Sequence, residues 1–140
     1  MNDFDKEIHE VLNKIGLDET DIEKIYEVNT NINFVLAEDI EDVIKYLKNY
    51  GLEDENIAEI AKKNPWILTE SFERMRYLEK YYEEVGLTEF GELLKRHPIA
   101  MSINPAKVKK FIVNMTADGK SKEELKELLL TEYDKYLSLK

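Results

Sequence analysis

The chain has 140 residues, 43% of them hydrophobic and 36% charged, which is enough apolar content for a hydrophobic core and too much for a disordered chain. Its formal net charge of -10 excludes a uniformly basic nucleic-acid binder and a polybasic membrane anchor, but it leaves room for a local basic surface. The absence of cysteine excludes disulfides, thiolate catalysis and cysteine-based zinc sites. The sequence shows no apolar run of membrane-spanning length and no targeting peptide, so we expect a cytoplasmic protein.

The first expected element is a helix over residues 4–15, where apolar residues recur at spacings of three and four. Asp3 is placed to cap its start, and Gly16 is placed to end it in the left-handed conformation that glycine adopts most easily. The apolar stripe consists of Phe4, Ile8, Val11, Leu12 and Ile15. This stripe predicts a helix that covers the N-terminal end of the fold.

A pattern that begins with glycine and leucine recurs along the chain at residues 16, 51 and 86, and a fourth glycine stands at position 119. Each copy contains a short helix with two aliphatic residues, a bend and a second amphipathic helix. Self-similarity at 33 to 35 residues is typical of stacked helical repeats. We therefore expect an all-α fold: a single domain forming a short superhelical solenoid, right- or left-handed, of about three helix-turn-helix repeats. Its expected parts are a capping helix over 1–15, repeats over 16–50, 51–85 and 86–118, and a C-terminal helix over 119–140.

Proline and tryptophan mark the bend of the second copy. Pro65 disfavours helical geometry in the residue before it, so the short helix over about residues 54–63 must end there. Residues 66–68 then turn the chain into the second helix. We expect the Trp66 ring in the core; the alternative is an exposed platform for stacking.

Two further helix starts show the spacing of a capping box, in which a hydroxyl residue is followed three residues later by glutamate. They are Thr20 to Glu23 and Ser121 to Glu124. Asn104 followed by Pro105 predicts the start of the second helix of the third copy. The last helix is expected to carry an apolar stripe as far as Leu137.

The glycine-leucine start, the two aliphatic residues and the bend that begins with proline are similar to the repeat of the mitochondrial transcription termination factor (mTERF) family. The motif is carried by Gly51-Leu52 with Pro65-Trp66-Ile67-Leu68, and by Gly86-Leu87 with Pro98-Ile99-Ala100-Met101. The first copy departs from it, with Thr30 at the proline position. The resemblance implies a curved stack of helix pairs whose basic concave surface binds double-stranded nucleic acid.

Charge is unevenly distributed along the chain. Residues 1–85 contain 22 acidic and 10 basic residues, whereas residues 86–140 contain 8 and 10. Basic residues also recur at equivalent positions of the second and third copies, and equivalent positions of stacked repeats form ladders along one surface. The pairs are Lys62 with Lys95, Lys63 with Arg96, Arg74 with Lys107 and Arg76 with Lys109, and Lys110 follows the last of them. The alternative is that these residues are ordinary solvated helix faces.

The sequence contains no arrangement typical of an active site. His9 and His97 lie in different copies and neither has a partner at metal-binding spacing. The acidic group over residues 38–42 lacks the glycine of a calcium loop, and we interpret it as the first turn of a helix. The chain also lacks a phosphate-cradling glycine loop and a nucleophile elbow. We expect no enzymatic activity, no cofactor and no metal site.

Two functions remain. The first is a nucleic-acid-binding helical-repeat protein, with duplex DNA as ligand and a regulatory role in transcription, that contacts phosphates through the nine basic residues above. Replacement of Lys135 or Lys140 is then expected to change little. The alternative is an acidic protein-interaction module in which the first copy docks on a basic protein partner. Neither function involves a membrane.

Overall fold

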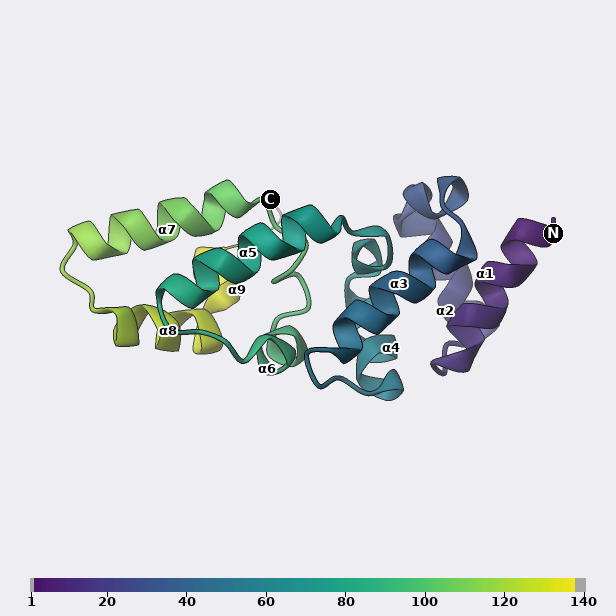
Figure 1. Cartoon of the computed structure of the whole chain (residues 1–140), viewed down its shortest axis with the longest axis horizontal. Helices are drawn as coiled ribbons and strands as arrows, with labels where there is room; N and C mark the ends of the chain where they lie inside the picture. The colour runs from purple at the N-terminus through teal and green to yellow at the C-terminus, as the bar shows by residue number, and fades with distance from the viewer. Residues whose placement is uncertain (1, 138–140) are drawn as a thin grey trace. The chain divides into compact units, whose positions relative to one another are not determined.

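The computed structural model describes residues 2–137, which form α-helices and two short 3-10 helices without a β-strand (Figure 1). The prediction of an all-α fold is confirmed. The chain divides into two compact units, unit 1 (Met1–Glu70) and unit 2 (Ser71–Lys140). Their boundary falls inside the second copy of the repeat, between its bend and its second helix. The single solenoid domain therefore stays a prediction.

Unit 1 is built around one central helix. Its elements are α1 (Asp3–Lys14), α2 (Glu19–Val28), the 3-10 helix η1 (Thr30–Phe34), α3 (Ala37–Lys48), α4 (Asp54–Lys63) and the 3-10 helix η2 (Pro65–Thr69). The central α3 packs against α1, α4 and η2, while α2 packs against α1 and α4. The aliphatic faces of these elements form the core: Ile8, Leu12, Ile22, Ile25, Ile32, Ile40, Leu47, Ile57 and Ile67.

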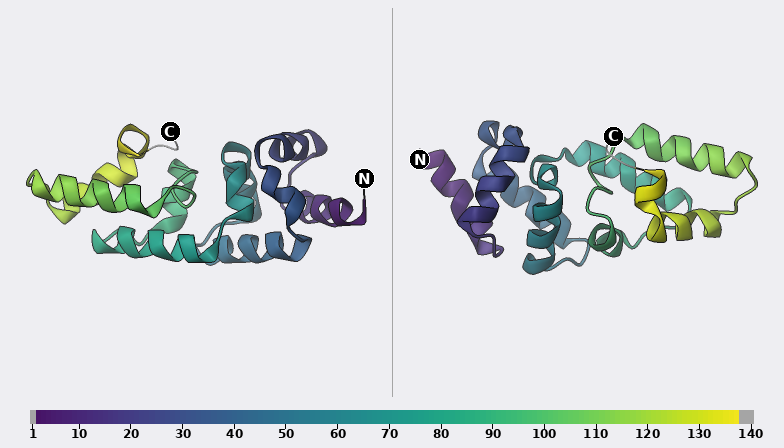
Figure 2. Two further views of the ribbon diagram at one scale, coloured as in Figure 1. Left: turned by 90° about the horizontal axis from the view of Figure 1, so that it is seen from above. Right: turned by 180° about the vertical axis from the view of Figure 1, so that it is seen from behind.

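Unit 2 consists of α5 (Phe72–Glu84), α6 (Phe90–Arg96), α7 (Pro105–Ala117), α8 (Lys122–Thr131) and α9 (Tyr133–Tyr136). α5 packs along α7, and the two helices run in the same direction in every view (Figures 1 and 2). α8 packs against α6, α7 and α9. Tyr82 and Tyr133 are fully buried in this core; the Tyr82 hydroxyl donates to the Ala100 carbonyl at 2.5 Å and lies 2.6 Å from the Tyr133 hydroxyl.

Glycine ends a helix ahead of each copy of the repeat, as predicted. The φ angles are 102° at Gly16, 86° at Gly51, 81° at Gly86 and 91° at Gly119, all in the region that a side chain disfavours. A Cβ built at any of the four would have no heavy atom within 4 Å. The conformation of the backbone, and not a lack of space, therefore explains why glycine marks the period.

Some helix starts differ from the predicted ones. α1 is capped by Asn2 instead of Asp3, and Phe4 is 62% exposed although the stripe predicted it to face inward. α2 begins with a capping box of Asp18 and Asp21, earlier than the predicted start at Thr20. The Asp18 carboxylate accepts the backbone N–H of Asp21 at 2.8 Å, and this bond holds the pKa of Asp18 below its usual value. The predicted caps at Asn104 and Ser121 are confirmed.

Trp66 was predicted in the core, and this prediction is wrong because the side chain is 40% exposed. The bend is the 3-10 helix η2, with three residues per turn, so Pro65 and Leu68 share one face and Trp66 lies off that face. Pro65, Ile67 and Leu68 are buried.

The predicted C-terminal helix is interrupted. α8 ends at Thr131, whose hydroxyl donates to the Glu127 carbonyl at 2.8 Å. Glu132, with φ -129° and ψ 29°, is not helical and separates α8 from α9. The apolar stripe still faces inward across the break at Leu125, Leu129, Tyr133 and Leu137. After the break α9 lies beside α7, since residues of both line one pocket and the rings of Phe111 and Tyr136 are in contact.

Candidate nucleic-acid interface

Among the helices of residues 2–137, α7 is the one that carries lysine without any aspartate or glutamate. Its three lysines, Lys107, Lys109 and Lys110, all lie in its first half. Asn104 caps the helix by accepting the backbone N–H of Ala106 at 3.0 Å. The first half of α7 therefore combines three cations with the positive end of the helix dipole.

The neighbouring helix α5 adds two further cations to this end of unit 2. Arg74 and Arg76 lie in the first half of α5, at positions equivalent to Lys107 and Lys109 of α7. Because α5 and α7 pack together in the same direction, their first halves lie at the same end of the pair (Figure 1). Residues two apart on a helix face different sides, so Arg74 with Lys107 and Arg76 with Lys109 form two separate pairs.

A surface pocket of about 360 Å³ lies between α7 and the segment of α9. It is lined by Lys107, Lys110, Phe111, Asn114, Met115, Tyr136 and Leu137. The ring centroids of Phe111 and Tyr136 are 5.4 Å apart, and Lys135 Nζ lies 5.3 Å from the centroid of the Tyr136 ring. Two ammonium groups, an amide and an aromatic wall suit a ligand in which an anionic group stands next to an apolar or planar group.

The other predicted contacts lie at the ends of the two short helices, and two of them already have acidic partners. Arg96, at the end of α6, contacts the Glu92 carboxylate at 3.0 Å, and Lys95 beside it is exposed. Lys62, at the end of α4 in unit 1, lies 3.0 Å from Glu59.

The hydrogen bond to Glu59 raises the pKa of Lys62, and Asp21, 3.9 Å away on α2, adds to that effect. Lys63 follows Lys62 and is exposed. The two carboxylates offset the positive charge of Lys62, so this lysine attracts a phosphate less strongly than a lysine without acidic neighbours. The structure therefore places five of the nine predicted residues in the first halves of the neighbouring helices α5 and α7, Lys95 and Arg96 on α6, and Lys62 and Lys63 in unit 1.

A protein-family model, mTERF, matches residues 2–140. The chain belongs to the mTERF family. This result confirms the resemblance seen in the repeats, and it makes the chain a helical-repeat protein of a nucleic-acid-binding family. Neither the curated proteins nor the solved structures contain a match to it.

The pocket of this mTERF chain joins two predicted contacts, Lys107 and Lys110, to residues that the sequence analysis did not assign to a site, among them Asn114 and Tyr136. Lys107, Lys110 and Asn114 recur at spacings of three and four on α7, a signal that could have been read from the sequence. Tyr136 reaches the pocket only because the chain breaks at Glu132, and no spacing predicts that contact. Lys135, whose replacement was expected to change binding little, lies over the Tyr136 ring beside the pocket. Lys140 lies outside the described residues.

The acidic group of residues 38–42 forms the first turns of α3, as predicted. Asp39 accepts the backbone N–H of Leu36 at 2.9 Å, which gives this carboxylate a structural role at the start of the helix. Within the described part of the mTERF chain, no group of three histidine, aspartate or glutamate residues is placed to hold a metal ion. No helix there is long and apolar enough to cross a membrane, and the expected cytoplasmic location stays a prediction.

Proposed function

We propose that this mTERF chain binds duplex DNA through phosphate contacts on unit 2 and acts, without catalysis, in the regulation of transcription. The observation that carries the proposal is the first half of α7, where three lysines without an acidic residue lie beside the arginines of α5. Lysine and arginine side chains attract the phosphate backbone whatever its base sequence. The family of the chain supports nucleic acid as the ligand class.

Electrostatics favour unit 2 as the binding unit. Unit 1 contains 18 acidic and 7 basic residues, whereas unit 2 contains 12 and 13. Phosphates are repelled by a strongly acidic surface, so contacts from Lys62 and Lys63 add little. Lys95 and Arg96 are proposed as weaker contacts, because Glu92 already offsets the charge of Arg96.

The proposal predicts a modest, salt-sensitive affinity. Each neutralised phosphate contributes about -0.9 to the slope of log affinity against log salt for duplex DNA. If each basic residue of α5 and α7 named above neutralises one phosphate, the slope is about -4.5. Contacts to the backbone alone give little preference for one base sequence over another.

The test is a fluorescence-anisotropy titration of the full chain against a labelled DNA duplex and the matching RNA duplex, at about 50 and about 200 mM salt. Replacing Arg74, Arg76, Lys107 and Lys109 together by glutamate should abolish binding. The matched control replaces four lysines of unit 1 by glutamate and so changes the net charge equally: Lys6, Lys14, Lys24 and Lys45. Equal losses in both variants, or no salt-sensitive binding by the wild type at micromolar protein, would overturn the proposal.

A further inference from the structure

Large hydrophobic side chains are exposed at one end of unit 1. Eight such side chains are exposed in the described chain, and four of them belong to α1, α2, η1 and the start of α3 in this unit: Phe4, Val28, Phe34 and Leu36. We call these four residues the apolar end. Phe34 is 87% exposed, whereas Ile32 of the same 3-10 helix is fully buried.

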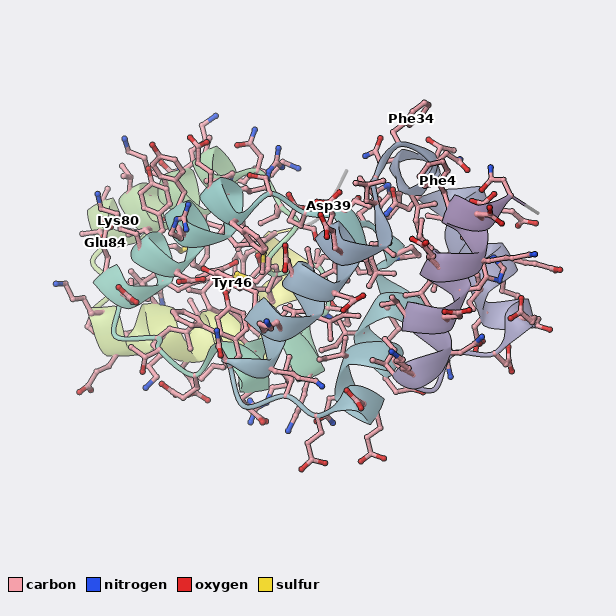
Figure 3. All side chains as sticks on the ribbon, turned by 45° about the vertical axis from the view of Figure 1, so that its right-hand side comes forward. Phe4, Phe34, Asp39, Tyr46, Lys80 and Glu84 are labelled. Carbon is pink, nitrogen blue, oxygen red and sulfur yellow. The ribbon has the colours of Figure 1, made fainter. Side chains whose placement is uncertain are left out.

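The fold brings these segments to the same end of the unit. Tyr26, in the last turn of α2, donates its hydroxyl to the Asp5 carboxylate in the first turn of α1 at 3.2 Å. The 3-10 helix η1 begins two residues after α2 ends, and Leu36 is the residue from which α3 starts. Figure 3 shows Phe4 and Phe34 projecting at this end, with Asp39 on the neighbouring turn of α3.

The apolar end is surrounded by negative charge. Residues 2–6 and 26–39, which contain all four apolar side chains, include five acidic residues and one basic residue. Asp5 and Asp39 hold hydrogen bonds within the unit, and Asp3, Glu27 and Glu38 are exposed. Such a surface repels nucleic acid and anionic lipid, and it attracts a chain that is apolar on one side and basic around it.

We propose that the apolar end docks a basic amphipathic helix of a partner protein. Phe4 and Phe34 are the anchors that the partner would bury, because exposed aromatic side chains lose little conformational entropy on binding and bury a large area. Lysine or arginine residues along the edge of the partner helix would meet Asp3, Glu27 and Glu38. The proposal uses none of the residues assigned to DNA binding and stands independently of it.

The experiment measures binding of the full chain to a fluorescein-labelled helical peptide of leucine and lysine, with leucines at positions i, i+3, i+4 and i+7. A peptide with glutamate in place of lysine is the charge control. The wild type should bind the lysine peptide and not the glutamate peptide. Replacing Phe34 and Leu36 together by serine should weaken binding by about tenfold or more. Val113→Ser, which removes an exposed hydrophobic side chain of unit 2, should leave peptide binding unchanged.

A second pair of variants tests the charge of the surface. Neutralising Asp3, Glu27 and Glu38 to their amides should weaken binding of the lysine peptide at low salt. Neutralising Glu83, Glu84 and Glu127 of unit 2 removes the same charge elsewhere and should have less effect. DNA binding by the Phe34 and Leu36 variant should equal that of the wild type, so failure of this proposal is distinguishable from failure of the DNA proposal.

Three results would overturn the proposal. One is unchanged binding of the lysine peptide to the Phe34 and Leu36 variant, and another is equal binding of both peptides or no binding up to about 100 μM peptide. The third is self-association of the wild type in sedimentation velocity that the same variant abolishes, because the apolar end would then be an interface between two copies of this chain.

Discussion

Units 1 and 2 each place a polar side chain at the end of the first helix of a repeat, but the two side chains are held in different ways. Asn29 ends α2 with φ -104° and ψ 85°, and His97 ends α6 with φ -136° and ψ 84°. Both are buried. The Asn29 amide donates to the Pro65 carbonyl at 2.9 Å and to Thr69 Oγ1 at 3.0 Å, so it ties one copy of the repeat to the bend of the next.

His97 makes a comparable link with less hydrogen bonding. Its Nε2 lies 2.8 Å from the Leu130 carbonyl, which makes that nitrogen the donor. Nδ1 has no hydrogen-bond partner in the described chain and lies 3.7 Å from an Asp134 carboxylate oxygen. The ring also stacks on Tyr133, with centroids 5.3 Å apart. The comparison shows that both units place a buried polar side chain at a similar backbone turn, while the partners of that side chain differ between the units.

The bends of the two units differ as well. Ile67 of unit 1 and Ala100 of unit 2 are equivalent positions 33 residues apart, and both are fully buried. Unit 1 fills its core with aliphatic side chains at the bend, whereas unit 2 has a small residue whose carbonyl accepts the Tyr82 hydroxyl. Unit 1 is therefore stabilised by aliphatic packing at a point where unit 2 uses a buried pair of tyrosines.

The largest effect is expected from Ile67→Ala. Removing a fully buried isoleucine leaves a cavity and should lower the free energy of unfolding by about 3 kcal/mol, measured by urea denaturation of the full chain. Trp66→Ala, at the neighbouring and partly exposed position, should cost only about 1 kcal/mol. We assign Ile67 to the core of unit 1 and Trp66 to its surface. Equal losses of stability at both positions would contradict this assignment.

Asn29→Ala should cost about 2 kcal/mol, because it removes the donors to Pro65 and Thr69 and leaves a buried carbonyl without its partner. Thermal unfolding followed by circular dichroism would report the loss. The control is Asn33→Ala, whose amide donates to the Thr30 carbonyl at an exposed site and should change stability by less than about 0.5 kcal/mol. A loss at Asn29 no larger than at Asn33 would show that the tie between repeats is dispensable.

Stability should fall as the pH rises above 10, and Tyr133 of unit 2 should make the largest contribution to this fall. Burial raises the pKa of Tyr133 above the ordinary value of 10.0, and partial burial with Asp5 nearby raises the pKa of Tyr26 to about 12. The unfolded chain then loses these protons before the folded chain does, so the stabilisation is complete below pH 10 and is lost above it.

For Tyr133 the loss between about pH 10 and 11 should be about 1 kcal/mol, and for the more exposed Tyr26 it should be smaller. Urea denaturation at several pH values would measure both. Tyr133→Phe should flatten the alkaline decline more than Tyr26→Phe does. A larger flattening by Tyr26→Phe than by Tyr133→Phe would show that the tyrosine responsible for the alkaline loss of stability lies in unit 1.

The smallest effect concerns the helix caps. Asp18→Ala should destabilise unit 1 near neutral pH, because the charged carboxylate caps α2, and the difference from the wild type should shrink as the pH falls through the lowered pKa of Asp18. Ser121→Ala removes an uncharged cap from α8 in unit 2, and its cost should depend less on pH. Thermal melting at neutral and acidic pH would separate the two. The same acid dependence in both variants would show that the charge of Asp18 is not what stabilises the cap.

Much of the fold could be predicted because single residues impose local geometry. Glycine at the end of each repeat, Pro65 after α4 and Asn104 before α7 each fix a turn through backbone preferences, and all three predictions are confirmed. The orientation of Trp66 could not be predicted, because the apolar pattern does not reveal that the bend has a 3-10 pitch. The break at Glu132 follows no strong sequence signal, since the apolar stripe continues through it.

Of the site, only the residues at equivalent positions of the repeats could be predicted from the sequence. Equivalence of Arg74 with Lys107, and of Arg76 with Lys109, follows from the spacing of the copies. The acidic neighbours of Lys62 depend on how α2 packs beside α4, and the wall that Tyr136 gives to the pocket depends on the position of α9. Such contacts between distant segments arise from packing, which local spacing does not encode.

The central claim is that nucleic acid binds unit 2 and not unit 1, and lysine footprinting tests it most directly. The full chain would be treated with an amine-acetylating reagent, with and without a saturating DNA duplex, and the modification of each lysine measured by mass spectrometry. We predict that Lys107, Lys109 and Lys110 lose reactivity when DNA is bound, while Lys24 and Lys45 of unit 1 keep theirs. Protection of Lys24 and Lys45 with no change on α7 would contradict the account.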